Sequence, residues 1–181
     1  FKYPNLVKEL VITYVNQLWV CDITYIYTID DKFCYLHLVT DAFSRMVIGY
    51  VLAPTLEAKY TIEALQQAIS HAGSGNLCGT IHHSDRGVQY CCDEYITQLK
   101  AHHIRISMTE DSNPTDNGMA ERVNGIIKNE FLEPLQTPKN LLEALPLVDH
   151  AVRTYNTLRP HLNLNMRTPA QVYEGNNNFI G

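Results

Sequence analysis

Three acidic residues lie in sequence contexts that suit the binding of metal ions. Asp22 sits in a run rich in Trp, Val, Ile, Thr and Tyr, Asp85 follows a short run ending in His-His-Ser, and Glu121 lies in a segment with helical periodicity. Mg²⁺ prefers hard oxygen ligands, and two such ions about 4 Å apart can activate an attacking oxygen and stabilise a leaving one. Together the three acids predict the cutting or joining of phosphodiester backbones.

Taken singly, each acid also has a simpler explanation. Asp85 could be only a turn or helix-cap residue, and Glu121 could be an ordinary solvated helix residue. Asp22 is harder to explain, because a charge within a strand is costly unless it is paired or bound to a metal. The prediction of a site therefore rests on the three acids jointly.

The elements that must position these acids can be located from the sequence pattern. Strands are expected over residues 18–27, 33–40, 45–52, 80–83 and 104–107. Helices are expected over residues 57–71, 88–101, 119–132 and 141–155, with a short last helix near Thr168-Pro169. Residues 109–118, rich in Asp, Ser, Asn and Pro, predict a loop before the helix of Glu121. This order predicts an α/β fold, a mixed sheet flanked by helices, in which Asp22 and Asp85 converge if their strands are neighbours.

Composition limits the class of protein. The chain has 181 residues, an apolar fraction of 45% and a formal net charge of −5, which fit one globular domain. A stand-alone DNA reader usually has a basic footprint, so the charge favours a catalytic core whose main DNA-binding module lies elsewhere. No apolar run is long enough to span a bilayer, there is no signal peptide, and the lack of an initiator Met suggests a fragment. The five cysteines follow no framework spacing and are expected to be reduced.

Several segments resemble the catalytic core of retroviral-type integrases. More closely, they resemble the transposases of the third family of bacterial insertion sequences, whose second reading frame supplies this core. The matching segments are Asn16 to Tyr25, Phe43-Ser44-Arg45, His83 to Tyr90, Asp116-Asn117 with Ala120-Glu121, Tyr155-Asn156, Arg159-Pro160-His161 and Thr168-Pro169-Ala170. The resemblance covers nearly the whole chain from residue 16.

The resemblance implies a fold, a cofactor and a reaction. The fold would be ribonuclease-H-like with a five-stranded mixed sheet, and Asp22, Asp85 and Glu121 would form a D-D-E triad that binds two Mg²⁺ or Mn²⁺ ions. One ion would activate water or a 3′-hydroxyl, the other would stabilise the leaving 3′ oxygen, and Asp22 would bridge both. The reaction would be DNA strand cleavage followed by strand transfer.

The resemblance also implies a domain plan and partners. Residues 1–16 would be a linker or entry strand from a missing upstream DNA-binding domain, residues 17–136 the integrase-like core, and residues 137–181 the C-terminal helices that complete it. The partners would be transposon-end and target DNA, further copies of the chain, and an upstream helix-turn-helix region or first-frame product. The location would be the bacterial cytoplasm, with no membrane contact.

Five further residues are candidates for DNA contact, each with a simpler alternative. Lys128 and Asn124 share the helix face of Glu121, since steps of three, four and seven residues return to one face, but either could be merely solvated. Arg86 and Gln89 could reach the DNA backbone. His83 could orient a carboxylate or touch substrate, or could simply pack at a strand end.

Two features depart from the family pattern. The loop before Glu121 is acidic, with Glu110, Asp111 and Asp116 where basic residues are frequent, and no helix-turn-helix lies within this sequence. The alternatives are therefore a retroelement integrase or related nuclease of the same fold, which the C-terminal motif disfavours, and a non-catalytic relic for DNA binding or dimerisation, which the intact triad disfavours.

Overall fold

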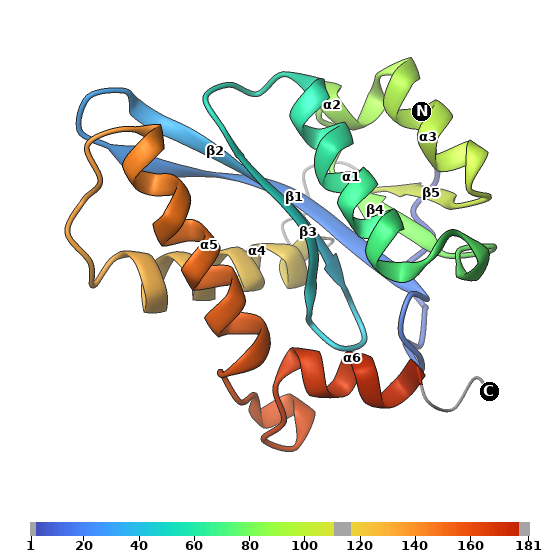
Figure 1. The fold of residues 1–181 in the computed structure, drawn as a ribbon. Coiled ribbons are helices and arrows are strands. Elements are labelled where there is room, and N and C mark those ends of the chain that lie inside the picture. Colours follow the sequence, from blue (N-terminus) through green and yellow to red (C-terminus); the bar gives the residue numbers. More distant parts are fainter. Residues whose placement is uncertain (1–2, 111–116, 178–181) are drawn as a thin grey trace.

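A five-stranded mixed sheet forms the centre of the molecule. In the computed structural model, which describes residues 3–110 and 117–177, the strands are β1 (Leu18–Thr28), β2 (Lys32–Asp41), β3 (Val47–Ala53), β4 (Ile81–Ser84) and β5 (Arg105–Met108). The order across the sheet is β3-β2-β1-β4-β5, with β1, β2 and β3 antiparallel and β4 and β5 parallel to β1 (Figure 1). The five predicted strands and the mixed sheet are confirmed, with boundaries shifted by one or two residues.

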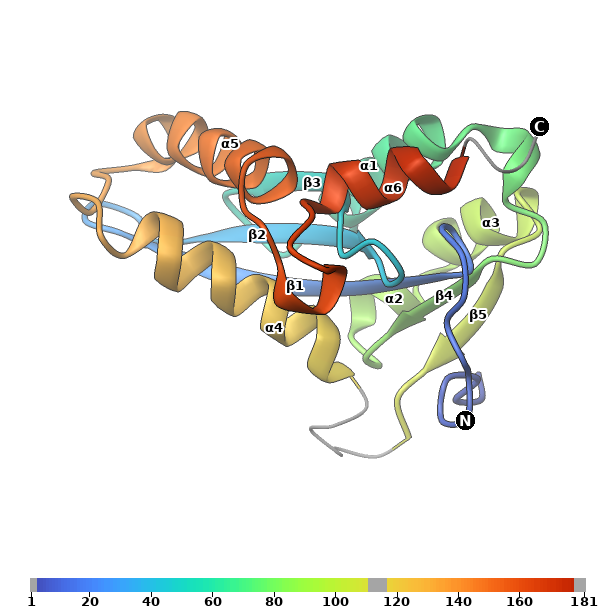
Figure 2. The ribbon, with the colours of Figure 1, turned by 90° about the horizontal axis from the view of Figure 1, so that it is seen from below.

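Helices cover both faces of the sheet. They are α1 (Ala58–Ala72), α2 (Val88–Cys91), α3 (Asp93–Ala101), α4 (Gly118–Ile126), the π-helical η3 (Ile127–Leu132), α5 (Leu141–Thr157) and α6 (Pro169–Asn177), with 3₁₀ turns η1 (Ser74–Asn76) and η4 (Leu162–Leu164). Figure 2 shows α1 and α4 on opposite sides of the sheet. Because β1 lies in the middle, its first four residues are all buried, and Trp19 is completely inaccessible.

Alternate residues of the strands contribute to hydrophobic clusters on the two faces of the sheet, as the period of a strand requires. On one face, Trp19 and Cys21 pack with residues of α1, α2 and α3. On the other, Leu36 and Leu38 pack with residues of α4, η3 and α5. Asp22 follows Cys21 and therefore points to the second face, where α4 lies.

Three details of the predicted elements were wrong. The single helix expected over residues 88–101 is two helices, because Cys92 is extended (φ −70°, ψ 147°) and α3 starts afresh at Asp93, whose charge suits a helix N-terminus. The helix expected over residues 119–132 is α-helical only to Ile126 and continues with the wider turns of η3. Arg45 is not a strand residue: it has a left-handed φ of 66°, and β3 starts at Val47.

The buried carboxylate of Asp41 explains the turn that contains Arg45. Asp41 accepts hydrogen bonds from the Asn16 backbone N–H (2.7 Å), the Ser44 backbone N–H (2.9 Å) and the Ser44 hydroxyl (2.6 Å). Burial raises its pKa, while these bonds oppose the rise. The carboxylate thereby closes the turn between β2 and β3 and joins it to the segment before β1.

Asn16 extends this network to the C-terminal helix. Its side-chain amide donates to the Tyr173 hydroxyl (3.0 Å) and its side-chain oxygen accepts from the Trp19 indole N–H (3.0 Å). Its backbone oxygen accepts from the Thr80 hydroxyl (2.7 Å). Residues 3–17 contain no strand, and the role of the segment before β1 as a linker from another domain stays a prediction.

Two other expectations from the sequence concern disulfide bonds and membrane-spanning helices. All five cysteines are free of disulfide bonds. In the part of the chain that the structure describes, no helix has the length and apolar character needed to cross a membrane. Residues 111–116 of the predicted acidic loop lie outside the described residues.

The contact between β3 and α1 depends on a glycine, and we predict that Gly49→Ala destabilises the fold by about 2 kcal/mol or more. A Cβ at Gly49 would lie 2.1 Å from the backbone oxygen of Ala64, so strand and helix must separate. Urea unfolding measures the change. The matched control is Gly175→Ala in α6, where the added Cβ meets nothing within 4 Å; an equal loss in both variants would contradict this account.

His82 makes stability depend on pH. It is buried against Tyr90 and Tyr95, and its Nε2 lies 2.7 Å from the Tyr95 hydroxyl. Burial, with a smaller contribution from His83, lowers its pKa to about 3. Because the folded pKa lies below the unfolded value of about 6.5, its contribution to stability is complete above that pH and is lost as the pH falls toward 3.

We therefore predict that His82→Gln flattens the pH dependence of unfolding. Between pH 7 and pH 5 the wild-type chain should lose about 2 kcal/mol more than the variant, measured by urea unfolding at both pH values. The exposed His150 supplies the control His150→Gln, which should keep the wild-type slope. Identical slopes for wild type and His82→Gln would refute the assignment.

Candidate active site

The register of the parallel strands brings two of the acids together. Val20 of β1 pairs with His83 of β4, so extending the register by two residues places Asp22 beside Asp85. Asp22 is partly buried on β1, and Asp85 is exposed just beyond the end of β4. The expected convergence of these strands is confirmed. Glu121 lies in the first turn of α4, also exposed, on the face of the sheet to which Asp22 points.

Asp22 is the electrostatic centre of this arrangement. Its Oδ2 accepts a hydrogen bond from the Asn124 side-chain amide (2.6 Å). Burial, together with the negative charges of Asp85 and Glu121, raises the pKa of Asp22 to about 7, against the opposing effect of hydrogen bonds. A buried carboxylate whose pKa is raised by neighbouring negative charges is stabilised in its ionised state by a cation.

Asp85 is held by the turn that leads into α2. Its Oδ1 accepts a hydrogen bond from the Gly87 backbone N–H (2.8 Å), as is typical of an Asx turn. Asp22 and Asp85 line a common pocket of about 240 Å³. The other residues that line it are Ile23, Thr24, Tyr25, Tyr35, Leu56, Gln89 and Tyr90.

The donor set has the chemistry of a Mg²⁺ or Mn²⁺ site but is not assembled as a complete cage. Carboxylate oxygens are the ligands these ions prefer, and two of them share one pocket. Within residues 3–110 and 117–177, no group of three His, Cys, Asp or Glu side chains is arranged to hold a metal ion. The negative charge of Glu121 acts on Asp22. The three carboxylates are therefore ligands of the chemical type that Mg²⁺ or Mn²⁺ binds.

Helix α4 contacts β1 through the polar face on which Glu121 was expected to lie with Asn124 and Lys128. Asn124 bonds to Asp22, and the Lys128 ammonium lies 3.4 Å from the Thr24 hydroxyl and 4.9 Å from the centre of the Tyr25 ring. The two helix residues therefore contact alternate residues on one face of the strand. Asn124 is buried, and Lys128 is partly buried on the same side as the pocket.

The other predicted DNA contacts have different surroundings. His83 is completely buried and its Nδ1 lies 2.8 Å from the Ser107 hydroxyl, which favours the packing alternative for this residue. Gln89 lines the acidic pocket and donates from its side-chain amide to the Leu56 backbone oxygen (3.1 Å). Arg86 is exposed beside Asp85. Contacts of all five residues with DNA stay predictions.

Sequence reasoning had not assigned Thr24, Tyr25 and Asn117 to the site. Asn117 is buried, and its side-chain amide donates to the Cys21 backbone oxygen (3.3 Å) while its own oxygen has no partner among the described residues. Sequence spacing could have indicated two of these residues. Thr24 lies two strand residues beyond Asp22, and Asn117 lies one helical turn before Glu121.

Comparison with known sequences identifies the family. A family model described as "Integrase core domain" matches residues 13–114, and a second model of the same description matches residues 102–169. A putative transposase for insertion sequence element IS986/IS6110 of Mycobacterium tuberculosis is 36% identical over 122 residues, which cover 66% of this chain and 44% of the relative. Transposase InsF for insertion sequence IS3A of Escherichia coli is 34% identical over 146 residues, covering 81% of this chain and 50% of the relative. The chain thus spans about half the length of these curated relatives.

Solved structures agree with the fold. The catalytic core domain of HTLV-2 integrase in complex with magnesium superposes with a TM-score of 0.68 at 28% identity, covering 87% of this chain and 96% of that one. A chain of the structure of the simian T-cell lymphotropic virus intasome in complex with PP2A regulatory subunit B56 gamma gives a TM-score of 0.74 over 94% of this chain and 58% of that one, at 23% identity, which bears on the fold alone. The sheet order and these neighbours confirm the predicted ribonuclease-H-like fold. With more than half of its residues matched by the first model, the chain belongs to the integrase core domain family.

Proposed function

We propose that this chain is the catalytic domain of a DDE transposase, which cleaves DNA strands and transfers them with the help of divalent metal ions. One observation supports this most directly: the β1–β4 register sets Asp22 beside Asp85 while α4 presents Glu121 on the same face. The similarity to transposases of insertion sequences indicates DNA as the substrate.

Asp22, Asp85 and Glu121 would hold the ions, Mg²⁺ or Mn²⁺, in the number of two that the resemblance implies. When bound, such ions stabilise negative charge on phosphate oxygens and lower the pKa of an attacking water or hydroxyl. The magnesium complex of HTLV-2 integrase supports a divalent ion for this chain. Neutralisation by the ions would also return Asp22 to its ionised state at neutral pH.

The surrounding residues orient the acids and the DNA. The Asn124 side-chain amide donates to one oxygen of Asp22, and the Gly87 backbone N–H donates to one oxygen of Asp85. Lys128 places an ammonium at the edge of the pocket, where it can pair with a phosphate oxygen of the strand being cut. Gln89 also lines the pocket, and its side-chain amide donates to the Leu56 backbone oxygen.

The complete protein would need further parts. Transposon-end and target DNA would be its partners, with further copies of the chain and an upstream helix-turn-helix region or first-frame product. The net charge of −5 is consistent with delivery of DNA by another module. A non-catalytic relic is disfavoured because all three acids are present in the sequence.

The triad gives the first test of this function. We predict that Asp22→Asn, Asp85→Asn and Glu121→Gln each abolish Mn²⁺- or Mg²⁺-dependent nicking and joining of oligonucleotides that bear the element's ends. Each variant should keep its circular dichroism spectrum. Asp22→Asn should also keep or raise the thermal midpoint, because the amide removes a partly buried charge whose pKa is raised.

The control for the triad is Glu94→Gln, an exposed acid in the first turn of α3. It should retain wild-type nicking. Full activity of any triad variant in the complete protein would show that the proposed reaction is wrong.

Asn124 and Lys128 give a second test that separates orientation from phosphate binding. Asn124→Ala should lower the rate of cleavage about 10-fold to 100-fold at saturating DNA, because Asp22 loses the bond that fixes it. Lys128→Gln should instead weaken DNA binding and reduce its dependence on salt by about one ion, because one phosphate contact is lost. Single-turnover cleavage and fluorescence anisotropy measure the two effects; the same effect in both variants would contradict the distinction.

A further inference from the structure

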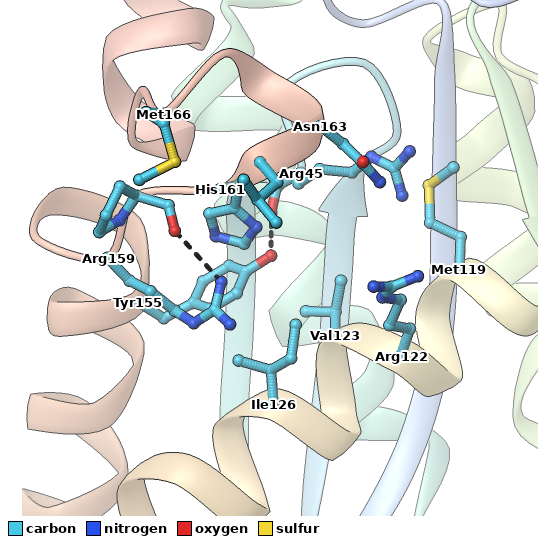
Figure 3. Close-up of a pocket in the computed structure, with 12 residues that line it drawn as sticks. Arg45, Met119, Arg122, Val123, Ile126, Tyr155, Arg159, His161, Asn163 and Met166 are labelled. Atoms are coloured by element: carbon cyan, nitrogen blue, oxygen red, sulfur yellow. Dashed lines mark hydrogen bonds between the residues drawn. The ribbon is translucent and has the colours of Figure 1, made fainter.

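A second cavity lies on another side of α4, away from the acidic pocket. It has a volume of about 450 Å³ and lies between α4, the β2–β3 turn and the segment after α5 (Figure 3). Its walls are mostly apolar or aromatic, but three arginines and a histidine project into it: Arg45, Arg122, Arg159 and His161. It is separate from the pocket of Asp22 and Asp85, whose lining residues are all different.

Only one of the three arginines is neutralised within the described residues. The Arg159 guanidinium makes a two-pronged contact with Glu130, from Nε to Oε2 (2.6 Å) and from Nη2 to Oε1 (2.7 Å). Arg45 and Arg122 have neither a side-chain hydrogen bond nor an ion pair with any residue in 3–110 or 117–177. Figure 3 shows their side chains entering the same cavity from the turn and from α4.

The Arg45 side chain is held in place by hydrogen bonds of its own backbone. The Tyr155 hydroxyl donates to the Arg45 backbone oxygen (2.8 Å), and the Arg45 backbone N–H donates to the Asp41 backbone oxygen (2.9 Å). The left-handed φ of 66° is stabilised by these bonds and by the Asp41–Ser44 contacts. Burial lowers the pKa of Arg45 and the charge of Arg122 acts in the same direction, while Tyr155 and the carboxylate of Asp41 oppose the shift.

On the opposite wall of the cavity, a buried polar atom of His161 is available for a further hydrogen bond. The Nε2 atom of His161 is buried and has no hydrogen-bond partner among the described residues. The His161 ring packs edge-on against Tyr155 at 5.2 Å, and its backbone bonds to Arg167 (3.1 Å) and Met166 (2.9 Å) close the loop around it. Such a buried polar atom is normally satisfied in the functional state.

We infer that this cavity binds a phosphodiester group of the DNA, held by the guanidinium groups of Arg45 and Arg122, at a point separate from the reacting phosphate. Guanidinium groups match phosphate oxygens in shape and charge, and apolar walls strengthen the attraction by excluding water. Arg122 directly follows Glu121 in α4, so one helix would contact DNA at the reactive acid and at this anchor. The inference rests on the proposed function for its choice of DNA over other anions.

DNA binding by the 181-residue chain tests this anchor. In a Glu121→Gln background that prevents cleavage, anisotropy with a labelled duplex should show about 10-fold weaker binding for Arg45→Gln/Arg122→Gln. The slope of log affinity against log salt should fall by about one to two. The control is Arg105→Gln on the edge strand β5, which removes an exposed guanidinium elsewhere and should change neither value appreciably.

A second measurement distinguishes DNA from a free anion. Inorganic phosphate should raise the thermal midpoint of the wild-type chain and of Arg105→Gln. It should raise the thermal midpoint of the double variant by a smaller amount. Without phosphate, the double variant should have the same thermal midpoint as the control. Neither substituted guanidinium makes a hydrogen bond or an ion pair with the described residues, so none is lost. If it unfolds, the exposed Arg122→Gln alone carries the comparison, with about half the change in slope.

Three results would overturn the inference: DNA affinity and salt slope equal to those of Arg105→Gln, no DNA binding by the parent chain, or a phosphate effect without any change in DNA binding. These outcomes are distinct from a failure of the proposed function. That function fails if the triad variants still cleave, whereas the anchor is measured in a variant that does not need to cleave.

Discussion

The contact between α4 and β1 is the constraint on which the rest of the site depends. An acidic side chain on the central strand is partly covered by a helix whose contacting face is polar, with Asn124 on Asp22, Lys128 on Thr24 and Asn117 on the backbone of Cys21. An apolar helix face would have buried Asp22 without a partner, at a cost of several kcal/mol. The polar face instead keeps the acid oriented while Val123 and Ile127 of the same helical segment complete the core beside it.

The three acids of the site are negative charges that lie close together, which is unfavourable for the stability of the fold. Two strands in parallel register and one helix bring like charges together, and the pKa of Asp22 is raised first by its burial and then by the charges of Asp85 and Glu121. Sites of this kind reduce stability for the sake of function, and the surrounding architecture must compensate. Compensation comes from two cores on opposite faces of one sheet and from the close packing of β3 on α1 at Gly49.

Much of this arrangement could be predicted from the sequence. Period-2 and helical patterns located all five strands and the helices to within a few residues, and the pattern around Asp22 and Asp85 anticipated their convergence. Local patterns could not show that Cys92 divides one helix, that η3 follows α4, or that Arg45 is left-handed. The turn that contains Arg45 is fixed by Asp41, which also makes a long-range contact with Asn16. The burial of His83 was likewise undecided, since its partner Ser107 comes from a strand more than 20 residues away.

The carboxylate of Asp41 links the segment before β1 to the turn that presents Arg45 to the cavity between α4 and the segment after α5. It binds the backbone of Asn16, from which the chain leads toward residue 1, and it also fixes the turn that presents Arg45. Asn16 in turn bonds to Tyr173 of α6, so the segment before β1 and the last helix meet at this point. A displacement of the segment before β1 must therefore either break a buried charge-assisted hydrogen bond or move the arginine with it.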